Sequence, residues 1–188
     1  MSNKKIKATY SHTIGVVAME GRGFSNPVDL VISSENLIYV LSRTNPEQPE
    51  GIRIGICNME REYFGDFGEY GTGRGQFVWP TALAIDQDDN IYLADEHNSR
   101  ISIFDKTGTF IDCWGEYGNT KGLINGPSGI CFDSAYNLLV VDQFNNRIQK
   151  FETPIVMKIE EALVAEQAKK LEELTYEEES KNADVESN

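Results

Sequence analysis

The stretch DEHNSRISIF brings an acid, an imidazole, an amide and a guanidinium close together as Asp95, His97, Asn98 and Arg100. Groups of this kind could form a general acid–base centre or part of a metal site. A zinc site, however, needs three or four converging His, Cys or carboxylate ligands. The chain has only one other histidine, His12, far away in the sequence, so the histidines do not supply a ligand set.

The same motif returns further along the chain as DQFNNRIQKF. This second copy carries Asp142, Asn145 and Arg147 at the same spacing, and Phe144 stands where the first copy has His97. A catalytic group is needed only once, so recurrence favours a structural role. We expect the Asp to end one strand, the Asn to turn the chain and the Arg to begin the next strand, with an Asp–Arg pair holding the turn. The histidine is then an exposed turn residue.

Other landmarks repeat in register with this motif. Three prolines open the repeats, and a glycine lies twelve residues before each of them: Pro27, Pro80 and Pro127, with Gly15, Gly68 and Gly115. The first repeat is weaker, because Ser42 stands in the place of the Asp. Its Arg-Ile pair, which begins at Arg53, is displaced by the insertion PEQPEG.

Between the landmarks lie short runs such as TALAID, NIYLAD, RISIF and TFIDCWG, rich in β-branched and aromatic residues and bounded by Gly, Asn and Asp. They predict four strands in each repeat of roughly 47 residues, which is typical of β-propeller blades. Several runs are apolar on both faces, as expected for sheets packed between neighbouring blades.

The segment PTALAIDQDDNIYLADEHNSRISIFDKTGTFIDCWGEYG resembles an NHL repeat, with its Pro opening, its Asp-x-x-Asn-x-Arg-Ile core and its closing Gly. Residues 80–118 and 127–151 match well and residues 27–71 more weakly. The resemblance implies an all-β fold, an NHL-type β-propeller with three four-stranded blades in this chain. NHL propellers usually have six blades, so the chain supplies half a ring.

We therefore expect a three-blade propeller half over residues 1–153, in which residues 7–15 form an unpaired outer strand. The third blade lacks that strand, so two copies would close a six-bladed homodimer by exchanging N-terminal strands. The alternative partner is another protein that supplies the missing blades.

A change of pattern after Phe151 predicts an amphipathic helix over residues 154–178. Thr153 can cap it and Pro154 suits its first position. Residues 179–188 are polar and acidic, which predicts a disordered tail.

Loops on a rigid scaffold are the best candidates for partner binding. The insertion after the second strand of the first repeat departs most from the repeat, and the Gly-rich loops between blades add two cations. The candidate residues are Asn45, Glu47, Gln48 and Glu50 in the insertion, with Arg74 and Lys121 in the inter-blade loops.

The remaining candidates are weak. Asp86, Asp88, Asp89 and Asn90 give a faint resemblance to a calcium loop, but the EF-hand glycine and final glutamate are absent, so we expect no cofactor beyond a weak possibility of structural Ca²⁺. Neither a Ser/His/Asp nor a Cys/His arrangement stands out. Two cysteines, Cys113 and Cys131, fall within strands and are expected to be core thiols.

Composition narrows the class of function. The net charge of −13 argues against nucleic acid as a partner, because backbone neutralisation requires clustered positive charge. The sequence contains no apolar run of 18 residues, which argues against membrane insertion. An odd cysteine count without a signal peptide favours the cytoplasm.

Together these features predict a non-enzymatic protein-interaction scaffold. The alternative is a metal-dependent enzyme with a site in the channel, because some NHL-like propellers are lyases that bind metal through several histidines and related propellers are lactonases. This chain has only two histidines.

Overall fold

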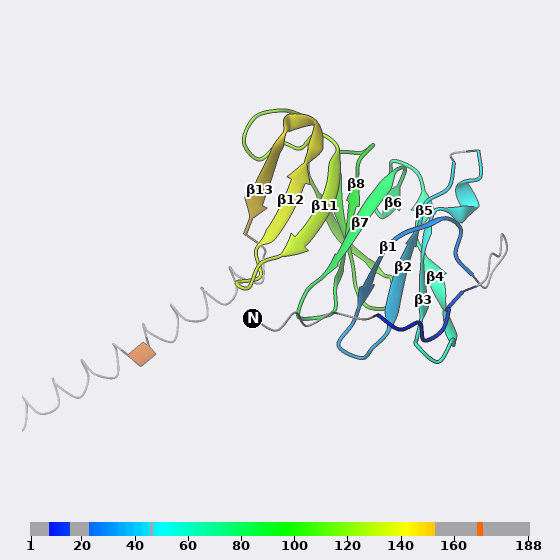
Figure 1. Ribbon diagram of the computed structural model, residues 1–188. Helices are drawn as coiled ribbons and strands as arrows, with labels where there is room; N and C mark the ends of the chain where they lie inside the picture. The colour runs from blue at the N-terminus through cyan, green and yellow to red at the C-terminus, as the bar shows by residue number, and fades with distance from the viewer. Residues whose placement is uncertain (1–7, 16–22, 46, 153–168, 171–188) are drawn as a thin grey trace, which may run out of the picture. The chain divides into compact units, whose positions relative to one another are not determined.

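The computed structural model describes residues 8–15, 23–45, 47–152 and 169–170 (Figure 1). The predicted helix over 154–178 and the predicted tail 179–188 lie outside the described residues, apart from Lys169 and Lys170. The chain divides into two compact units, residues 1–131 with 140–149, and residues 132–139 with 150–188. The architecture is all-β, as the sequence predicted. No helix within the described residues has the length and hydrophobicity to span a bilayer.

The first blade is a four-stranded antiparallel sheet with its strands in sequence order. Its strands are β1 (Pro27–Ile32), β2 (Ile38–Ser42), β3 (Arg53–Cys57) and β4 (Tyr63–Phe67). The insertion between β2 and β3 contains a short 3₁₀ turn, η1 (Pro49–Gly51), and leaves the pairing of the two strands regular, with Ser42 opposite Arg53.

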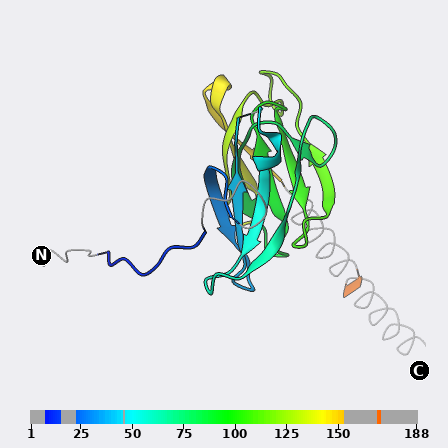
Figure 2. The ribbon, with the colours of Figure 1, turned by 90° about the vertical axis from the view of Figure 1, so that its right-hand side faces the viewer.

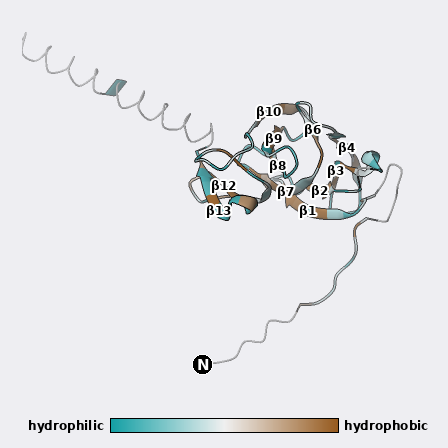
Figure 3. Cartoon of the chain, turned by 90° about the horizontal axis from the view of Figure 1, so that it is seen from above, coloured by the Kyte–Doolittle hydropathy of each residue, from teal (hydrophilic) through white to brown (hydrophobic). Residues whose placement is uncertain are grey.

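The second blade repeats this arrangement. Its strands are β7 (Pro80–Ile85), β8 (Ile91–Asp95), β9 (Arg100–Phe104) and β10 (Phe110–Trp114). A short parallel pair, β5 (Glu69–Tyr70) and β6 (Gln76–Phe77), lies in the connection between the two blades. Strands β1 and β7 lie side by side, as the view from above in Figure 3 shows.

The third sheet has three strands, in the order β11 (Pro127–Phe132), β12 (Leu138–Asp142) and β13 (Arg147–Phe151). A single 3₁₀ turn, η2 (Gln143–Asn145), connects β12 to β13. Each of the three repeat prolines begins the first strand of its sheet, where the missing N–H of proline is tolerated.

The second unit contains the turn before β12. The Asp133 carboxylate accepts hydrogen bonds from the backbone N–H groups of Ala135 and Asn137, and it lies 3.0 Å from Lys150 Nζ. These donors, first among them the Asn137 amide and Lys150, hold the pKa of Asp133 below its usual value.

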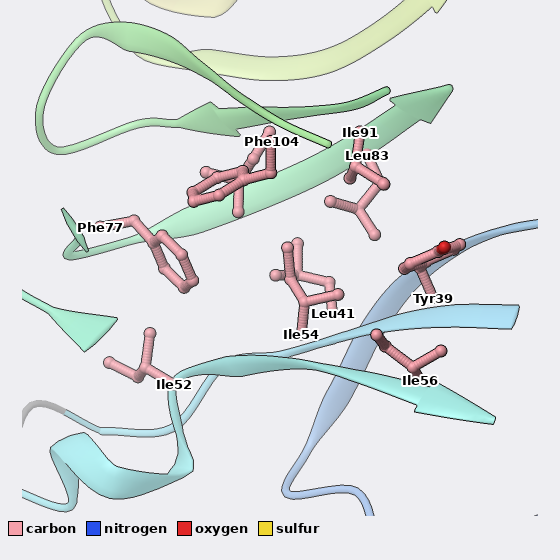
Figure 4. Close-up of a cluster of buried hydrophobic side chains, with 10 residues drawn as sticks. Tyr39, Leu41, Ile52, Ile54, Ile56, Phe77, Leu83, Ile91 and Phe104 are labelled. Carbon is pink, nitrogen blue, oxygen red and sulfur yellow. The ribbon is translucent and has the colours of Figure 1, made fainter. Parts of the chain in front are cut away.

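The main hydrophobic core lies between the first and second blades (Figure 4). Its buried members are Tyr39, Leu41, Ile52, Ile54, Ile56, Phe77, Leu83, Ile91, Leu93 and Phe104. Phe67, at the end of β4, packs between the two blades with its ring centroid 5.2 Å from that of Phe104. The outer strand of one blade therefore also contacts the next blade.

Residues 8–15 form no strand with the sheets of this chain, and their dark blue trace runs outside them in Figure 2. The end of this segment nevertheless contacts the first blade. Ile14 packs with Phe24 against Ile38, Val40 and Cys57, on the face of the first blade that is not used in the main core.

Candidate protein-interaction surface

The two aspartates of the repeated motif are fully buried, and each holds the backbone just before the first strand of its own sheet. Asp95 accepts hydrogen bonds from the backbone N–H groups of Val78 and Trp79, both at 3.0 Å, and from the Asn98 amide at 2.6 Å. Asp142 likewise accepts from the backbone N–H of Asn125 at 2.7 Å. Each carboxylate thus satisfies backbone donors that would otherwise be buried without a partner.

The arginines of the motif hold the inter-blade loops. Arg100 donates to the backbone carbonyls of Thr72, Gly73 and Gln76. Arg147 makes the equivalent bonds one repeat later, to the carbonyls of Asn119, Thr120 and Leu123. A guanidinium suits this task because its several donors have a fixed planar geometry.

The asparagines complete the same network. Asn98 donates to the carbonyl of Gly71, and Asn145 donates to that of Gly118. Asp, Asn and Arg together therefore fix the shape of the two loops that carry Arg74 and Lys121. Most polar groups of the motif are thus already hydrogen-bonded to the backbone or to one another; Arg100 Nε is buried and has no hydrogen-bond partner among the described residues.

The electrostatics of the third sheet differ in one respect from those of the second. Arg147 Nε lies 2.7 Å from the Asp142 carboxylate. Burial opposes ionisation of Asp142, but the Asn125 amide, the Asn145 side chain and Arg147 outweigh it and hold the pKa of Asp142 below its usual value.

The Asp, Asn and Arg of the first motif copy are engaged in the hydrogen bonds just described, which leaves His97 as its other candidate for chemistry. His97 is exposed in the turn between β8 and β9. Among the described residues, no three His, Cys, Asp or Glu side chains converge closely enough to hold a metal ion.

The acidic turn between β7 and β8 is held by hydrogen bonds. Asp86 accepts from the backbone N–H groups of Asp88 and Asn90. Asp89 accepts from the backbone N–H and hydroxyl of Ser34, in the first blade. These two carboxylates thus stabilise the turn and the contact between blades.

The insertion predicted to bind a partner is exposed at Asn45, Glu47, Gln48 and Glu50, and Pro46 lies outside the described residues. Its bonds are local: the Asn45 side chain accepts from the Glu47 N–H, and Thr44 donates to the carbonyl of Gln48. Glu47 and Glu50 are both exposed to solvent, and their role in partner binding stays a prediction.

The two cationic candidates differ in their surroundings. Arg74 forms an exposed ion pair with Asp112, at 2.7 Å, and its guanidinium lies 5.5 Å from the centre of the Phe110 ring. Lys121 is exposed in the following inter-blade loop, beside Gly122, whose N–H is bound by Gln149. The sequence placed both in loops, but it gave no sign that Arg74 is stacked on the outer strand of the second blade.

Sequence reasoning missed a cation–aromatic pair between the first two blades. The Arg43 guanidinium lies 4.6 Å from the centre of the Trp79 ring and donates to the carbonyl of Pro80. Trp79 directly precedes a repeat proline, and Arg43 follows Ser42, so both positions could have been identified from the repeat register.

The cysteine prediction needs a correction. Cys57 is buried, but Cys113 is only half-buried and Cys131 is exposed on β11. A position within a strand therefore did not place these thiols in the core.

This fold defines a class: a β-propeller assembled from repeated four-stranded blades. Residues 77–104 match the NHL repeat family, which confirms the resemblance found in the sequence. The chain is 35% identical over 78 residues to Protein brain tumor of Drosophila melanogaster, a match that covers 42% of this chain and 8% of that protein. It is 40% identical over 58 residues to the B-box type zinc finger protein ncl-1 of Caenorhabditis elegans, covering 31% of this chain and 7% of the relative.

A solved structure of a gluconolactonase-like protein superposes with a TM-score of 0.51 and 11% identity, over 71% of this chain and 46% of its own. At that identity the likeness shows the propeller fold alone. The chain spans under a tenth of the length of the two relatives above, so their activities as whole proteins do not transfer to it.

Proposed function

We propose that this chain is a non-enzymatic protein-interaction module that closes a six-bladed propeller as a homodimer. One observation carries the proposal: apolar positions that are buried in the second blade are exposed at the equivalent positions of the first blade and of the third sheet. Leu30 is 54% exposed, whereas its equivalent Leu83 is 4% exposed. Ile148 is 69% exposed, whereas its equivalent Ile101 is fully buried.

Burial of these side chains favours association. Removing a large aliphatic side chain from water contributes about 1.5–3 kcal/mol. The exposed residues lie on β1 of the first blade and on β13 of the third sheet, the two ends of the blade series. Two copies related by a two-fold axis would cover both ends and give the six blades that are usual for this type of propeller.

The mass of the purified chain in solution tests this proposal. Light scattering at micromolar concentration is expected to give twice the 21.1 kDa of one chain. A monomer would contradict it. A complex with a different host protein in native mass spectrometry, and no homodimer, would instead favour the other source of the missing blades.

The insertion loop is the proposed contact for further partners. Replacing Glu47, Gln48 and Glu50 together with alanine is expected to remove co-purifying host proteins while leaving the dimer mass unchanged, because these side chains are exposed. A matched control replaces Glu60 and Glu62, in the turn before β4, which are also exposed acidic residues. Equal loss of partners in both variants would contradict a specific role of the loop.

Metal analysis separates this module from a channel enzyme. We expect no stoichiometric metal in the purified dimer. One metal ion per chain, retained after dialysis, would favour the enzyme class.

A further inference from the structure

The end of the N-terminal segment repeats, in detail, the way an outer strand meets the next blade. A Cβ atom added at Gly15 would lie 2.5 Å from the Phe24 ring, and one added at Gly68 would lie 2.2 Å from the Phe77 ring. Both glycines have positive φ, +90° and +94°, and in both cases the aromatic residue follows nine positions later. Residues before Gly15 therefore take the place that the end of β4 takes before Gly68.

The neighbours on either side repeat as well. Phe67, just before Gly68, packs into the core that includes Phe104 of the second blade. Ile14, just before Gly15, packs against Cys57, which is the equivalent of Phe104 in the first blade. His12 Nε2 also lies 3.3 Å from the carbonyl of Met59, in the turn that follows β3.

This arrangement identifies the blade to which the N-terminal segment belongs. An outer strand contacts the blade that follows its own, as β4 does with the second blade. The N-terminal segment contacts the first blade, so it is the outer strand of the blade that precedes the first one. None of the residues that the structure describes ahead of β1 forms a sheet. Three blades are too few to close a ring on themselves.

We infer that residues 10–14 pair with β13 of a second copy of this chain, with Ile14 opposite the partner's Ile148 and Thr13 opposite the partner's Gln149. The register follows from the two complete blades. Phe67 lies opposite Ile54, and Trp114 lies opposite Ile101. This inference rests on the proposed homodimer and adds the segment, the strand and the register that form its interface.

The pairing of Thr13 with the partner's Gln149 follows from the two complete blades in the same way. Asp66 lies opposite Gly55, and Cys113 lies opposite Ser102, one position further from the glycine. Thr13 and Gln149 occupy those positions in the N-terminal segment and in β13. Antiparallel strands use opposite residues as the unit of stabilisation, so the register fixes which side chains meet.

A hydrogen bond between the first strands of neighbouring sheets also supports a second copy of this chain as the partner. Thr81, the second residue of β7, donates a hydrogen bond to the carbonyl of Pro127 at 2.7 Å, and so ties the second blade to the first strand of the third sheet. The third sheet keeps a hydroxyl at this position, Ser128. In a closed ring the Ser128 hydroxyl would donate to the carbonyl of Pro27 in the partner's first blade. Pro27 begins β1, just as Pro127 begins β11.

A cysteine cross-link tests the register. One chain carries Thr13→Cys, a second chain carries Gln149→Cys, and both carry Cys57→Ala, Cys113→Ser and Cys131→Ser to remove competing thiols, because Cys57 lines the same pocket as Thr13. Opposite residues in an antiparallel pair have Cα atoms about 4.5–5.5 Å apart, which suits a disulfide. On mixing and mild oxidation we expect most chains to form a covalent dimer that reducing agent separates, while neither variant alone forms one.

The matched control replaces Ser11 in place of Thr13. Ser11 is exposed and lies two residues before Thr13. Its equivalents in the two complete blades, Phe64 and Ile111, fall at a register shift and have no residue opposite them, so in the inferred register a cysteine at residue 11 would not face residue 149. Cross-linking through residue 11 as efficient as through residue 13 would overturn the register.

The mass measurement distinguishes failure of the strand exchange from failure of the homodimer itself. A dimer by light scattering without the 13–149 cross-link would overturn the strand exchange and leave the homodimer standing. A monomer would overturn both. A double variant that forms its disulfide within one chain would show that residues 10–14 complete their own third sheet, and would also overturn the exchange.

Discussion

At the scale of single residues, the repeated Asp, Asn and Arg act on backbone. The buried aspartates accept main-chain N–H groups, and the arginines donate to main-chain carbonyls. Hydrogen bonds that involve a charged group contribute more than neutral ones, so these three residues hold loops that contain little regular structure of their own. Their recurrence reflects the recurrence of the loops.

The substitution Arg100→Lys is expected to lower the free energy of unfolding by about 2 kcal/mol, because a lysine keeps the charge but cannot bind three carbonyls in one plane. Urea unfolding at a fixed protein concentration measures the effect. Arg74→Lys is the control: its ion pair with Asp112 is exposed, so the changed geometry of that pair is expected to cost less than about 1 kcal/mol. Equal effects of the two substitutions would contradict the role of Arg100 in the loop.

Acid should weaken the third sheet through Asp142. Because the folded state holds the pKa of this buried carboxyl below its unfolded value of about 3.9, the stabilisation is complete above that pH and is lost as the pH falls below it. Urea unfolding of the natural chain and of Asp142→Asn, at several values between pH 7 and about 3, measures the difference. We expect Asp142→Asn to be less stable at neutral pH and the gap to narrow in acid. If the difference in stability between the two proteins widened in acid, folding would not lower the pKa of Asp142 and the prediction would be wrong.

At the scale of elements, the strands followed from the sequence because their pattern is local. The prolines begin β1, β7 and β11, and the insertion in the first repeat forms η1 without disturbing the pairing of β2 with β3. The exposure of Cys131 and the stacking of Arg74 on Phe110 did not follow, because both depend on what covers a strand face. Local patterns fix the strands, whereas coverage is set by neighbouring sheets.

The glycine before each connection should be intolerant of any side chain. Gly68→Ala adds a Cβ that would lie 2.2 Å from the Phe77 ring, in addition to the cost of positive φ. Gly65→Ala in the same strand also has positive φ, at +123°, but meets nothing within 4 Å. Gly68→Ala is therefore expected to be more destabilising than Gly65→Ala by about 1–3 kcal/mol in thermal or urea unfolding. Similar losses would show that backbone strain alone explains the glycine.

At the scale of the whole molecule, both ends of the blade series expose apolar side chains that could cover one another. The first blade presents Leu30 and Ile32 beside the docked Ile14, and the third sheet presents Val141 and Ile148. The count and phase of the strands in the sequence predicted half of a six-bladed ring, which stays a prediction. The sequence could not show that the Gly15–Phe24 contact is already formed in one chain, because that contact depends on how close the two residues come in space.

The substitution Ile148→Glu tests whether the exposed face of β13 is covered by a second chain in solution. Ile148 is 69% exposed in the single chain, so a glutamate there should leave each chain folded, with an unchanged circular dichroism spectrum. In the proposed dimer the same side chain lies opposite Ile14 of the partner, where a carboxylate would be buried without a compensating charge. We therefore expect Ile148→Glu to raise the dimer dissociation constant at least about 100-fold, which corresponds to about 2.8 kcal/mol, in analytical ultracentrifugation. Ile111→Glu on β10 is the matched control, because Ile111 is also exposed but lies on an outer strand that already has its partner β9, and its dimer should persist. A dimer that survives Ile148→Glu, or that is lost equally with Ile111→Glu, would place the interface elsewhere.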